Sequence, residues 1–169
     1  MERTSKRIAA AGIARPERPE AAEFEFKPED SVGYMLRDTY RAFARELGSR
    51  LAHEKVSMGM WFFLRALWEE EGLTQRELSR RIGMMEPTTV SALASMERRG
   101  LVKRERDPND RRRRIVRLTR KGRNLKGKLL PAAYATNQLA LEGVSETEIR
   151  QLKKALSKMK QNLIAHWSD

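Results

Sequence analysis

Apolar residues recur at three- and four-residue steps near both ends of the region 30–165, which predicts amphipathic helices. The first run follows Asp30 and Ser31, either of which can cap a helix, and consists of Leu36, Tyr40, Phe43, Leu47 and Leu51. The last run follows the capping-box pattern of residues 145–148 and consists of Ile149, Leu152, Leu156, Met159 and Leu163. A broader apolar face over residues 57–70 predicts a further helix, which Gly72 ends.

Turn-forming residues divide the middle of the chain into short elements. Residues 74–77, Thr-Gln-Arg-Glu, form a capping-box pattern that opens a short helix ending at Gly83. Pro87 fits the first position of a helix over 87–99, where its missing N–H would be unpaired anyway, and Gly100 ends that helix.

A hairpin is predicted next, because residues 101–104 and 115–118 suit strands and flank the turn sequence Asp-Pro-Asn-Asp of residues 107–110. Thr119 caps a long helix that Pro131 should kink or split. A short helix, a tight turn, a second helix and a hairpin together predict a winged helix-turn-helix. The chain as a whole is predicted to be mainly α.

The basic residues are concentrated in one block. The 169-residue chain has a formal net charge of +12, and residues 76–128, with 18 Lys/Arg and six Asp/Glu, account for all of it. Such a block is typical of nucleic-acid-binding proteins, in which Lys and Arg displace counterions from phosphates. A solvated surface would explain a uniform excess better than a block between near-neutral segments.

Composition disfavours several classes of protein. The chain has no Cys and two His, which excludes disulfides, Cys-based zinc sites and thiol sensors, and no cofactor is expected. It also lacks a Gly-rich phosphate loop and a nucleophile with a plausible His partner, so we do not expect an enzyme. No stretch reaches the roughly 18 apolar residues of a membrane helix, and residues 8–14 are too weakly apolar for a signal peptide. We expect a cytoplasmic protein without a membrane partner.

The predicted helix over 87–99 has two different faces at about 100° per residue. Thr89, Leu93 and Met96 share the side that would pack on the short helix and the hairpin. Small side chains on the opposite side suit the major groove, where they can meet phosphates, base edges or a thymine methyl. This side carries Pro87, Thr88, Val90, Ser91, Ala94, Ser95 and Arg98. An ordinary exposed helix face is the alternative interpretation.

The predicted hairpin tip carries four consecutive arginines, Arg111, Arg112, Arg113 and Arg114. Arginine suits a narrow minor groove, and Asp107 and Asp110 neutralise only part of the charge, so phosphate is the expected remaining partner. A solvated charge run is the alternative. The next helix starts with further basic residues that are expected at the flanking DNA backbone, namely Lys121, Arg123, Lys126 and Lys128.

Several of these segments resemble the MarR family of bacterial transcription regulators. The resemblance covers roughly residues 31–165 and is carried by residues 73–78, 87–90, 97–102, 107–112 and 118–122. It implies a homodimer that contacts duplex DNA, with Asp110 and Arg112 as the family's Asp-x-Arg in the wing. The expected DNA-binding residues are Thr74, Gln75, Pro87, Thr88, Val90, Ser91, Ser95, Arg98, Asp110, Arg111, Arg112, Arg113 and Arg114. Ser91 and Ser95 stand where many relatives have Arg, which favours a larger role for the wing.

The resemblance also implies a division of the chain. Residues 57–118 would form the winged helix-turn-helix, and residues 30–56 and 119–169 a helical dimerisation region. Residues 1–29, which mix Ala, Glu, Arg and three Pro without apolar periodicity, would form a flexible arm.

Family members often release DNA when they bind a small aromatic anion. Trp61, Phe62 and Phe63 are consecutive, so they cannot all face one core, and Arg65 and Tyr40 are candidate polar partners. We therefore hypothesise an effector site at Tyr40, Trp61, Phe62 and Arg65 for an aromatic acid or its CoA thioester; ordinary core packing is the alternative. The expected function is a repressor that leaves a pseudo-palindromic operator on effector binding. A nonspecific or architectural nucleic-acid-binding protein is the second hypothesis.

Overall fold

The computed structural model describes residues 27–110 and 112–167. The chain divides into one unit that ends at Arg37 and another that begins at Asp38. The first unit contains the 3-10 helix η1 (Pro28–Asp30) and the start of α1 (Val32–Ala52). Ser31 Oγ accepts a hydrogen bond from the Tyr34 amide at 3.2 Å, which confirms that Ser31 caps this helix. The prediction for residues 8–14 and that for residues 1–26 of the flexible arm lie outside the described residues. The last two residues of the predicted arm, Pro28 and Glu29, lie in η1.

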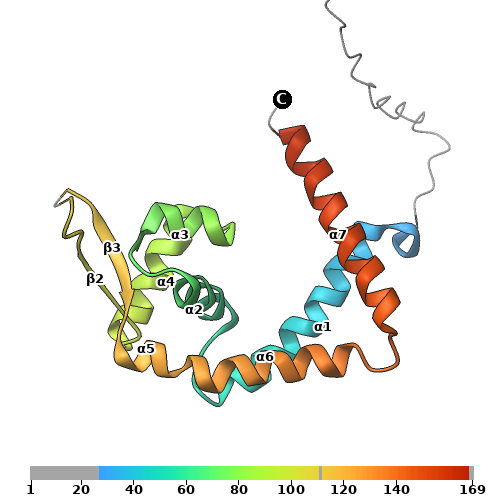
Figure 1. Cartoon of the computed structure of the whole chain (residues 1–169), viewed down its shortest axis with the longest axis horizontal. Helices are drawn as coiled ribbons and strands as arrows, with labels where there is room; N and C mark the ends of the chain where they lie inside the picture. Colours follow the sequence, from blue (N-terminus) through green and yellow to red (C-terminus); the bar gives the residue numbers. More distant parts are fainter. Residues whose placement is uncertain (1–26, 111, 168–169) are drawn as a thin grey trace, which may run out of the picture. The chain divides into compact units, whose positions relative to one another are not determined.

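The second unit confirms the predicted mainly helical, winged helix-turn-helix order (Figure 1). It contains the rest of α1 and then α2 (Met58–Glu69), β1 (Leu73–Thr74), α3 (Gln75–Ile82), α4 (Glu86–Arg98), β2 (Val102–Arg106), β3 (Arg114–Leu118), α5 (Arg120–Asn124), α6 (Lys126–Ala140) and α7 (Glu146–Trp167). None of the helices within the described ranges is both long enough and apolar enough to cross a membrane.

Three further predicted helix starts are confirmed by their hydrogen bonds. Glu77 N donates to Thr74 Oγ1 at 3.2 Å, while Thr74 N donates to Glu77 Oε2 at 2.7 Å, which completes the capping box. Thr119 Oγ1 accepts from Gly122 N at 3.1 Å at the start of α5, and Ser145 and Glu148 form the corresponding pair of bonds before α7. Each bond satisfies an amide that the first helical turn would otherwise leave unpaired.

The wing is part of a three-stranded antiparallel sheet with the order β1-β3-β2. β2 and β3 form the predicted hairpin, in register from Val102 opposite Leu118 to Arg106 opposite Arg114. β1, which the sequence analysis did not predict, pairs Leu73 with Val116. The short strand therefore attaches the residues before α3 to the base of the wing.

One predicted helix start is off by one residue, and the predicted split at Pro131 is wrong, whereas the alternative of a kink there stays a prediction. α4 starts at Glu86, so Pro87 occupies its second position rather than its first, where the missing N–H is equally harmless. The long helix after Thr119 is interrupted at Leu125, between α5 and α6, whereas Pro131 lies inside α6. Buried Leu125 and Leu129 fix the first turns of α6 in the core, and this burial offsets the one hydrogen bond that Pro131 removes.

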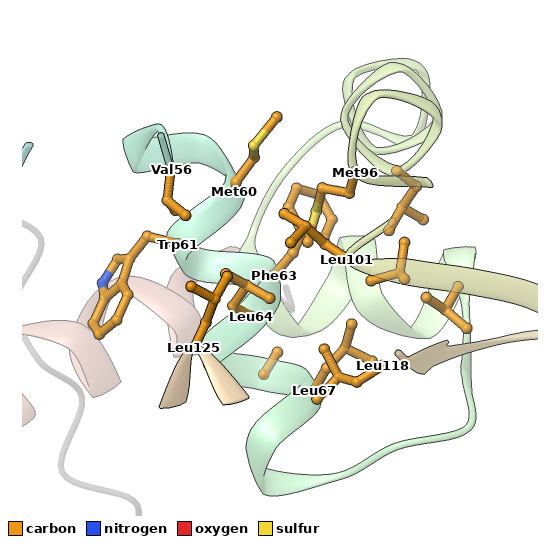
Figure 2. Packing of buried hydrophobic residues seen from close by; sticks show 14 of the residues in the cluster. Val56, Met60, Trp61, Phe63, Leu64, Leu67, Met96, Leu101, Leu118 and Leu125 are labelled. Carbon is orange, nitrogen blue, oxygen red and sulfur yellow. The ribbon is translucent and has the colours of Figure 1, made fainter. Parts of the chain in front are cut away.

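The core lies between α2, α3, α4 and the sheet. Figure 2 shows Phe63, Leu64 and Leu67 of α2 facing the side chains of the other elements, while the Trp61 ring leaves α2 in a different direction. Thr89, Leu93 and Met96 are all fully buried, which confirms the predicted inner face of α4. The inner face of α4 is therefore packed against the core, and its opposite face stays at the surface.

Gly122 in α5 lies against the chain segment between α4 and β2. A Cβ atom at this position would come within 2.2 Å of the Leu101 carbonyl oxygen and within 3.1 Å of a Leu118 methyl group. The Gly122 carbonyl also accepts a hydrogen bond from the Trp68 indole nitrogen at 3.0 Å. The backbone of α5 thus packs closely enough on its neighbours to exclude any side chain here.

Thr89→Val should stabilise the protein by about 1 kcal/mol, because the fully buried Thr89 Oγ1 has no hydrogen-bond partner among the described residues. Valine has the same shape and removes the unpaired hydroxyl. Thermal unfolding at fixed protein concentration measures the change. Exposed Thr88→Val is the matched control and should change stability by less than about 0.5 kcal/mol. A lower melting temperature for Thr89→Val would contradict the prediction.

Candidate DNA-binding surface

The outer face of α4 matches the sequence prediction in most positions. Pro87, Thr88, Val90, Ser91 and Arg98 are exposed, whereas Ala94 and Ser95 are half-buried. Before α4, Gly83 adopts the left-handed conformation with φ 68°, which allows the tight turn between α3 and α4. After α4, Gly100 with φ 65° redirects the chain into β2. α4 therefore offers small polar and apolar side chains to solvent along its N-terminal half.

Arg104 of β2 joins the wing to both helices of the helix-turn-helix. Its guanidinium donates to Glu97 of α4 through Nε at 2.9 Å and Nη2 at 2.5 Å, and through Nη1 to Gln75 Oε1 at 3.3 Å. The Arg104 side chain also holds the pKa of Glu97 below its usual value. Gln75, a predicted DNA contact, therefore accepts a hydrogen bond inside the chain through its amide oxygen, while its amide NH₂ can still donate to a ligand.

Asp110 organises the backbone of the wing tip. Its carboxylate accepts a hydrogen bond from the Arg112 amide at 3.0 Å, and its carbonyl accepts from the Arg113 amide at 2.9 Å. The Arg112 side chain is exposed and has no carboxylate partner in the described part of the chain. The aspartate thus acts on the backbone of Arg112 and leaves its guanidinium available to a ligand.

Arg113 differs from Arg112, because its Nη2 donates to Glu77 Oε1 at 2.8 Å. Glu77 is the capping residue of α3, and its pKa is lowered first by the hydrogen bonds from Thr74 and then by the charge of Arg113. The pair ties the wing tip to the start of α3. Arg114 is exposed at the start of β3, and Arg111 lies outside the described residues.

The start of α3 is also joined to the start of α4, by Arg76 and Glu86 with 3.5 Å between Nε and Oε1. The structure therefore brings three of the predicted DNA-contacting elements together: the first turn of α3, the N-terminal half of α4 and the wing. The sequence analysis missed Glu77, Glu97 and Arg104 as positioning residues, because their partners lie on other elements. The available signal in the sequence was the presence of two glutamates, Glu77 and Glu97, within a strongly basic block, where each is expected to pair with a nearby cation.

Most of the basic residues predicted at the flanking DNA backbone have partners inside the chain. Arg123 forms two hydrogen bonds with Glu71, at 2.8 and 2.7 Å, and these raise its pKa. Lys128 pairs with Glu54 at 2.9 Å, and Lys121 donates to the Arg99 carbonyl at 3.0 Å. Lys126 lines a pocket of about 260 Å³ together with Trp68 and Arg123.

The candidate effector residues do not form one described cavity. Trp61 is 6% exposed, Phe62 is half-buried and Phe63 is fully buried. The Arg65 guanidinium lies 5.8 Å from the Trp61 ring and pairs with Glu69 at 3.3 Å, while Tyr40 is exposed on α1. Trp61 also meets Trp68 edge to face, with 5.8 Å between the ring centroids.

Comparison with known proteins places this geometry in a family. Residues 56–113 match the family model described as the MarR family. The chain is 36% identical over 124 residues to the HTH-type transcriptional regulator TtmR of Methylorubrum extorquens (strain PA1), an alignment that covers 73% of this chain and 63% of TtmR. The chain thus spans less than two thirds of that relative's length.

Two solved structures share the fold. A probable transcriptional regulator from Pseudomonas aeruginosa has a TM-score of 0.71 and 28% identity, over 79% of this chain and 99% of that one. CouR from Rhodococcus jostii RHA1, solved bound to p-coumaroyl-CoA, has a TM-score of 0.71 and 24% identity, over 80% of this chain and 95% of CouR. The family match, the relative TtmR and the shared fold show that the winged helix-turn-helix region of this chain, over residues 56–113, is of the MarR type.

Proposed function

We propose that the protein is a sequence-specific DNA-binding transcriptional regulator that acts as a homodimeric repressor. The observation that carries the proposal is the wing tip, where Asp110 orders the backbone and leaves the exposed Arg112 guanidinium without a carboxylate partner among the described residues. Ion pairs join the wing to the first turn of α3 and to the C-terminal turn of α4, and a third ion pair joins the starts of α3 and α4. This arrangement supports α4 in the major groove and Arg112 in the minor groove.

A second copy of the chain is the proposed partner of α6 and α7. Large apolar side chains on these helices are exposed in the single chain: Tyr134 by 66%, Leu139 by 48%, Leu152 by 50% and Leu163 by 57%. No described side chain of α7 is buried, although its apolar residues recur on one face. Burial of such a face against its symmetry mate would give two winged domains and hence a pseudo-palindromic operator.

The proposed effector is an aromatic acid or its CoA thioester. Cationic groups beside Trp61 and Trp68 support this effector class. The Arg65 guanidinium lies over the Trp61 ring, and Trp68 lines a pocket together with Arg123 and Lys126. CouR, which has the same fold, was solved with a CoA thioester of an aromatic acid. In this chain a ligand carboxylate would have to replace Glu69 as the partner of Arg65.

Selection of bound sequences from random DNA, followed by titration at physiological salt, tests the proposed function. We expect a two-fold symmetric site with half-sites about one helical turn apart and a preference of at least about 10³ over random duplex. A preference below about tenfold would instead identify a nonspecific or architectural binder. Aromatic acids and their CoA thioesters, added to the preferred complex, should release the DNA. If none of them does, the effector part of the proposal fails and the DNA-binding part stands.

A further inference from the structure

The turn between α1 and α2 contains a lysine where a glycine is usual. Val56 N donates to Leu51 O at 3.1 Å and Lys55 N donates to Ala52 O at 2.8 Å, which is the hydrogen-bond pattern of a Schellman motif. The left-handed position of that motif is Lys55, with φ 56°, and no other non-glycine among the described residues has a positive φ. L-residues disfavour this conformation, so the turn alone does not account for a lysine here.

Lys55 lines a hollow of about 220 Å³ with cationic groups from two other elements. Arg99 enters from the C-terminal end of α4 and Lys121 from the first turn of α5. Buried Leu101 and Leu125 form the apolar part of the lining, which His53 and Glu54 complete. Three cationic residues from three separate segments of the chain thus line one small space.

The positive charge of this hollow is not neutralised inside the chain. Lys121 Nζ donates to the Arg99 carbonyl at 3.0 Å, and Arg99 donates to Met60 Sδ at 3.1 Å and to the Lys55 carbonyl, all of which are uncharged acceptors. Neither these two residues nor Lys55 has a carboxylate partner within the described ranges. Glu54, the acidic residue of the lining, is paired with Lys128 at 2.9 Å.

Spare donors remain on each cation. A lysine ammonium has three N–H groups and an arginine guanidinium has five, whereas Lys121 uses one and Arg99 uses two in the contacts above. The hollow therefore combines uncompensated charge with unused hydrogen-bond donors. An anion with several acceptor oxygens satisfies both.

We propose that this hollow binds the phosphate group of a small phosphorylated molecule. A phosphate monoester carries a charge of about −1.5 to −2 with three acceptor oxygens, which suits three cations better than a single carboxylate does. The volume leaves room for one phosphate and a small apolar substituent against Leu101 and Leu125. Arg99, the C-cap of α4, lies 11 positions after Thr88, roughly 16 Å along the helix axis, so the hollow is distant from the N-terminal half of α4. Because Lys121 is also predicted at the flanking DNA backbone, the test includes DNA binding.

Isothermal titration of the full chain with phenyl phosphate, in the absence of DNA, tests the proposal. We expect saturable binding with a Kd below about 1 mM, weakened at least about tenfold by Lys55→Gly and by Lys121→Gln, because each change removes a charged donor. Glycine is favoured at φ 56°, so Lys55→Gly should melt no lower than the wild type, and its loss of binding cannot come from unfolding. Lys158→Gln, at an exposed position of α7, is the matched control and should bind as the wild type does.

Further titrations compare phenyl phosphate with inorganic phosphate, with benzoate and with duplex DNA. Tighter binding of phenyl phosphate than of inorganic phosphate supports a phosphate monoester, and equal binding supports the free ion. Benzoate should bind at least about tenfold more weakly than phenyl phosphate. No saturable phosphate binding, or equal binding by the Lys55→Gly/Lys121→Gln double variant, overturns the proposal. If the same double variant instead weakens duplex DNA binding while phosphate shows no affinity, the hollow is a DNA-backbone contact and the proposal is wrong.

Discussion

Gly122→Ala should destabilise the protein by about 3 kcal/mol, because the new methyl group would lie 2.2 Å from the Leu101 carbonyl oxygen. That atom belongs to the backbone and accepts a hydrogen bond from the Thr119 amide at 3.0 Å, so it cannot move away independently of the β3–α5 junction. Any shift of α5 would also strain the bond from the Trp68 indole to the Gly122 carbonyl. Thermal unfolding should show a melting temperature lower by roughly 10 °C for a chain of this length.

Gly127→Ala is the matched control for this prediction. Gly127 lies in the first turn of α6, and a Cβ there would meet no atom within 4 Å. Alanine at an exposed helical position should stabilise the protein by up to about 1 kcal/mol. The two glycines, five residues apart, should therefore respond in opposite directions. A Gly122→Ala variant that melts within about 2 °C of the wild type would contradict the close approach of Gly122 to the Leu101 carbonyl.

Arg112→Ala should weaken operator binding by roughly ten- to a hundredfold, with no change in melting temperature. The arginine is exposed at a tip whose backbone Asp110 holds, and its guanidinium takes part in no ion pair within the described residues, so its loss leaves the fold intact. Fluorescence anisotropy with the selected operator at fixed salt measures the affinity. Arg112→Lys should recover only part of the loss, because an ammonium lacks the planar fork of donors.

Two further variants show whether the effect belongs to the wing. Arg150→Ala removes one exposed cation from α7 and should leave the affinity unchanged. Arg113→Ala should have a smaller effect than Arg112→Ala, because Arg113 is already paired with Glu77 at 2.8 Å. Equal affinities of Arg112→Ala and the wild type would remove Arg112 from the proposed interface.

Local hydrogen bonding explains why most elements were predictable from the sequence. The capping residues Thr74, Thr119 and Ser145 bond to groups three residues away, so the residues that decide each helix start are adjacent in sequence. β1 was not predictable in this way. Its two residues carry no periodicity, and the pairing partner of Leu73 is Val116, 43 positions later.

Tertiary contacts likewise explain the misplaced helix break. The sequence pattern predicted a kink or a split at Pro131, because an interior proline removes a helical hydrogen bond, and only the split is contradicted. The structure interrupts the helix at Leu125, where Gly122 packs on Leu101 and Trp68 bonds to the Gly122 carbonyl from 54 residues away. Such contacts depend on α2 and the α4–β2 junction being in place and leave no mark in the local pattern.

The candidate interface was predictable as a surface, but the state of each side chain was not. The block of basic residues and the outer face of α4 follow from charge and periodicity. Carboxylates on other elements decide which arginines form ion pairs inside the chain. Glu77 pairs with Arg113, and Glu97 pairs with Arg104. The apolar face of α7 was similarly predicted, whereas the exposed apolar residues of α6 were not, and the partner of both helices stays a prediction.

The ion pairs of the basic block have a consequence for the thermodynamics of DNA binding. At least eight of its 18 cations already have a carboxylate within 4 Å in the described residues: Arg76, Arg81, Lys103, Arg104, Arg113, Arg117, Arg123 and Lys128. A cation that keeps such a partner displaces few counterions from a phosphate. With eight of the 18 cations paired, the salt dependence of DNA binding should correspond to at most ten phosphate contacts per chain from this block rather than 18.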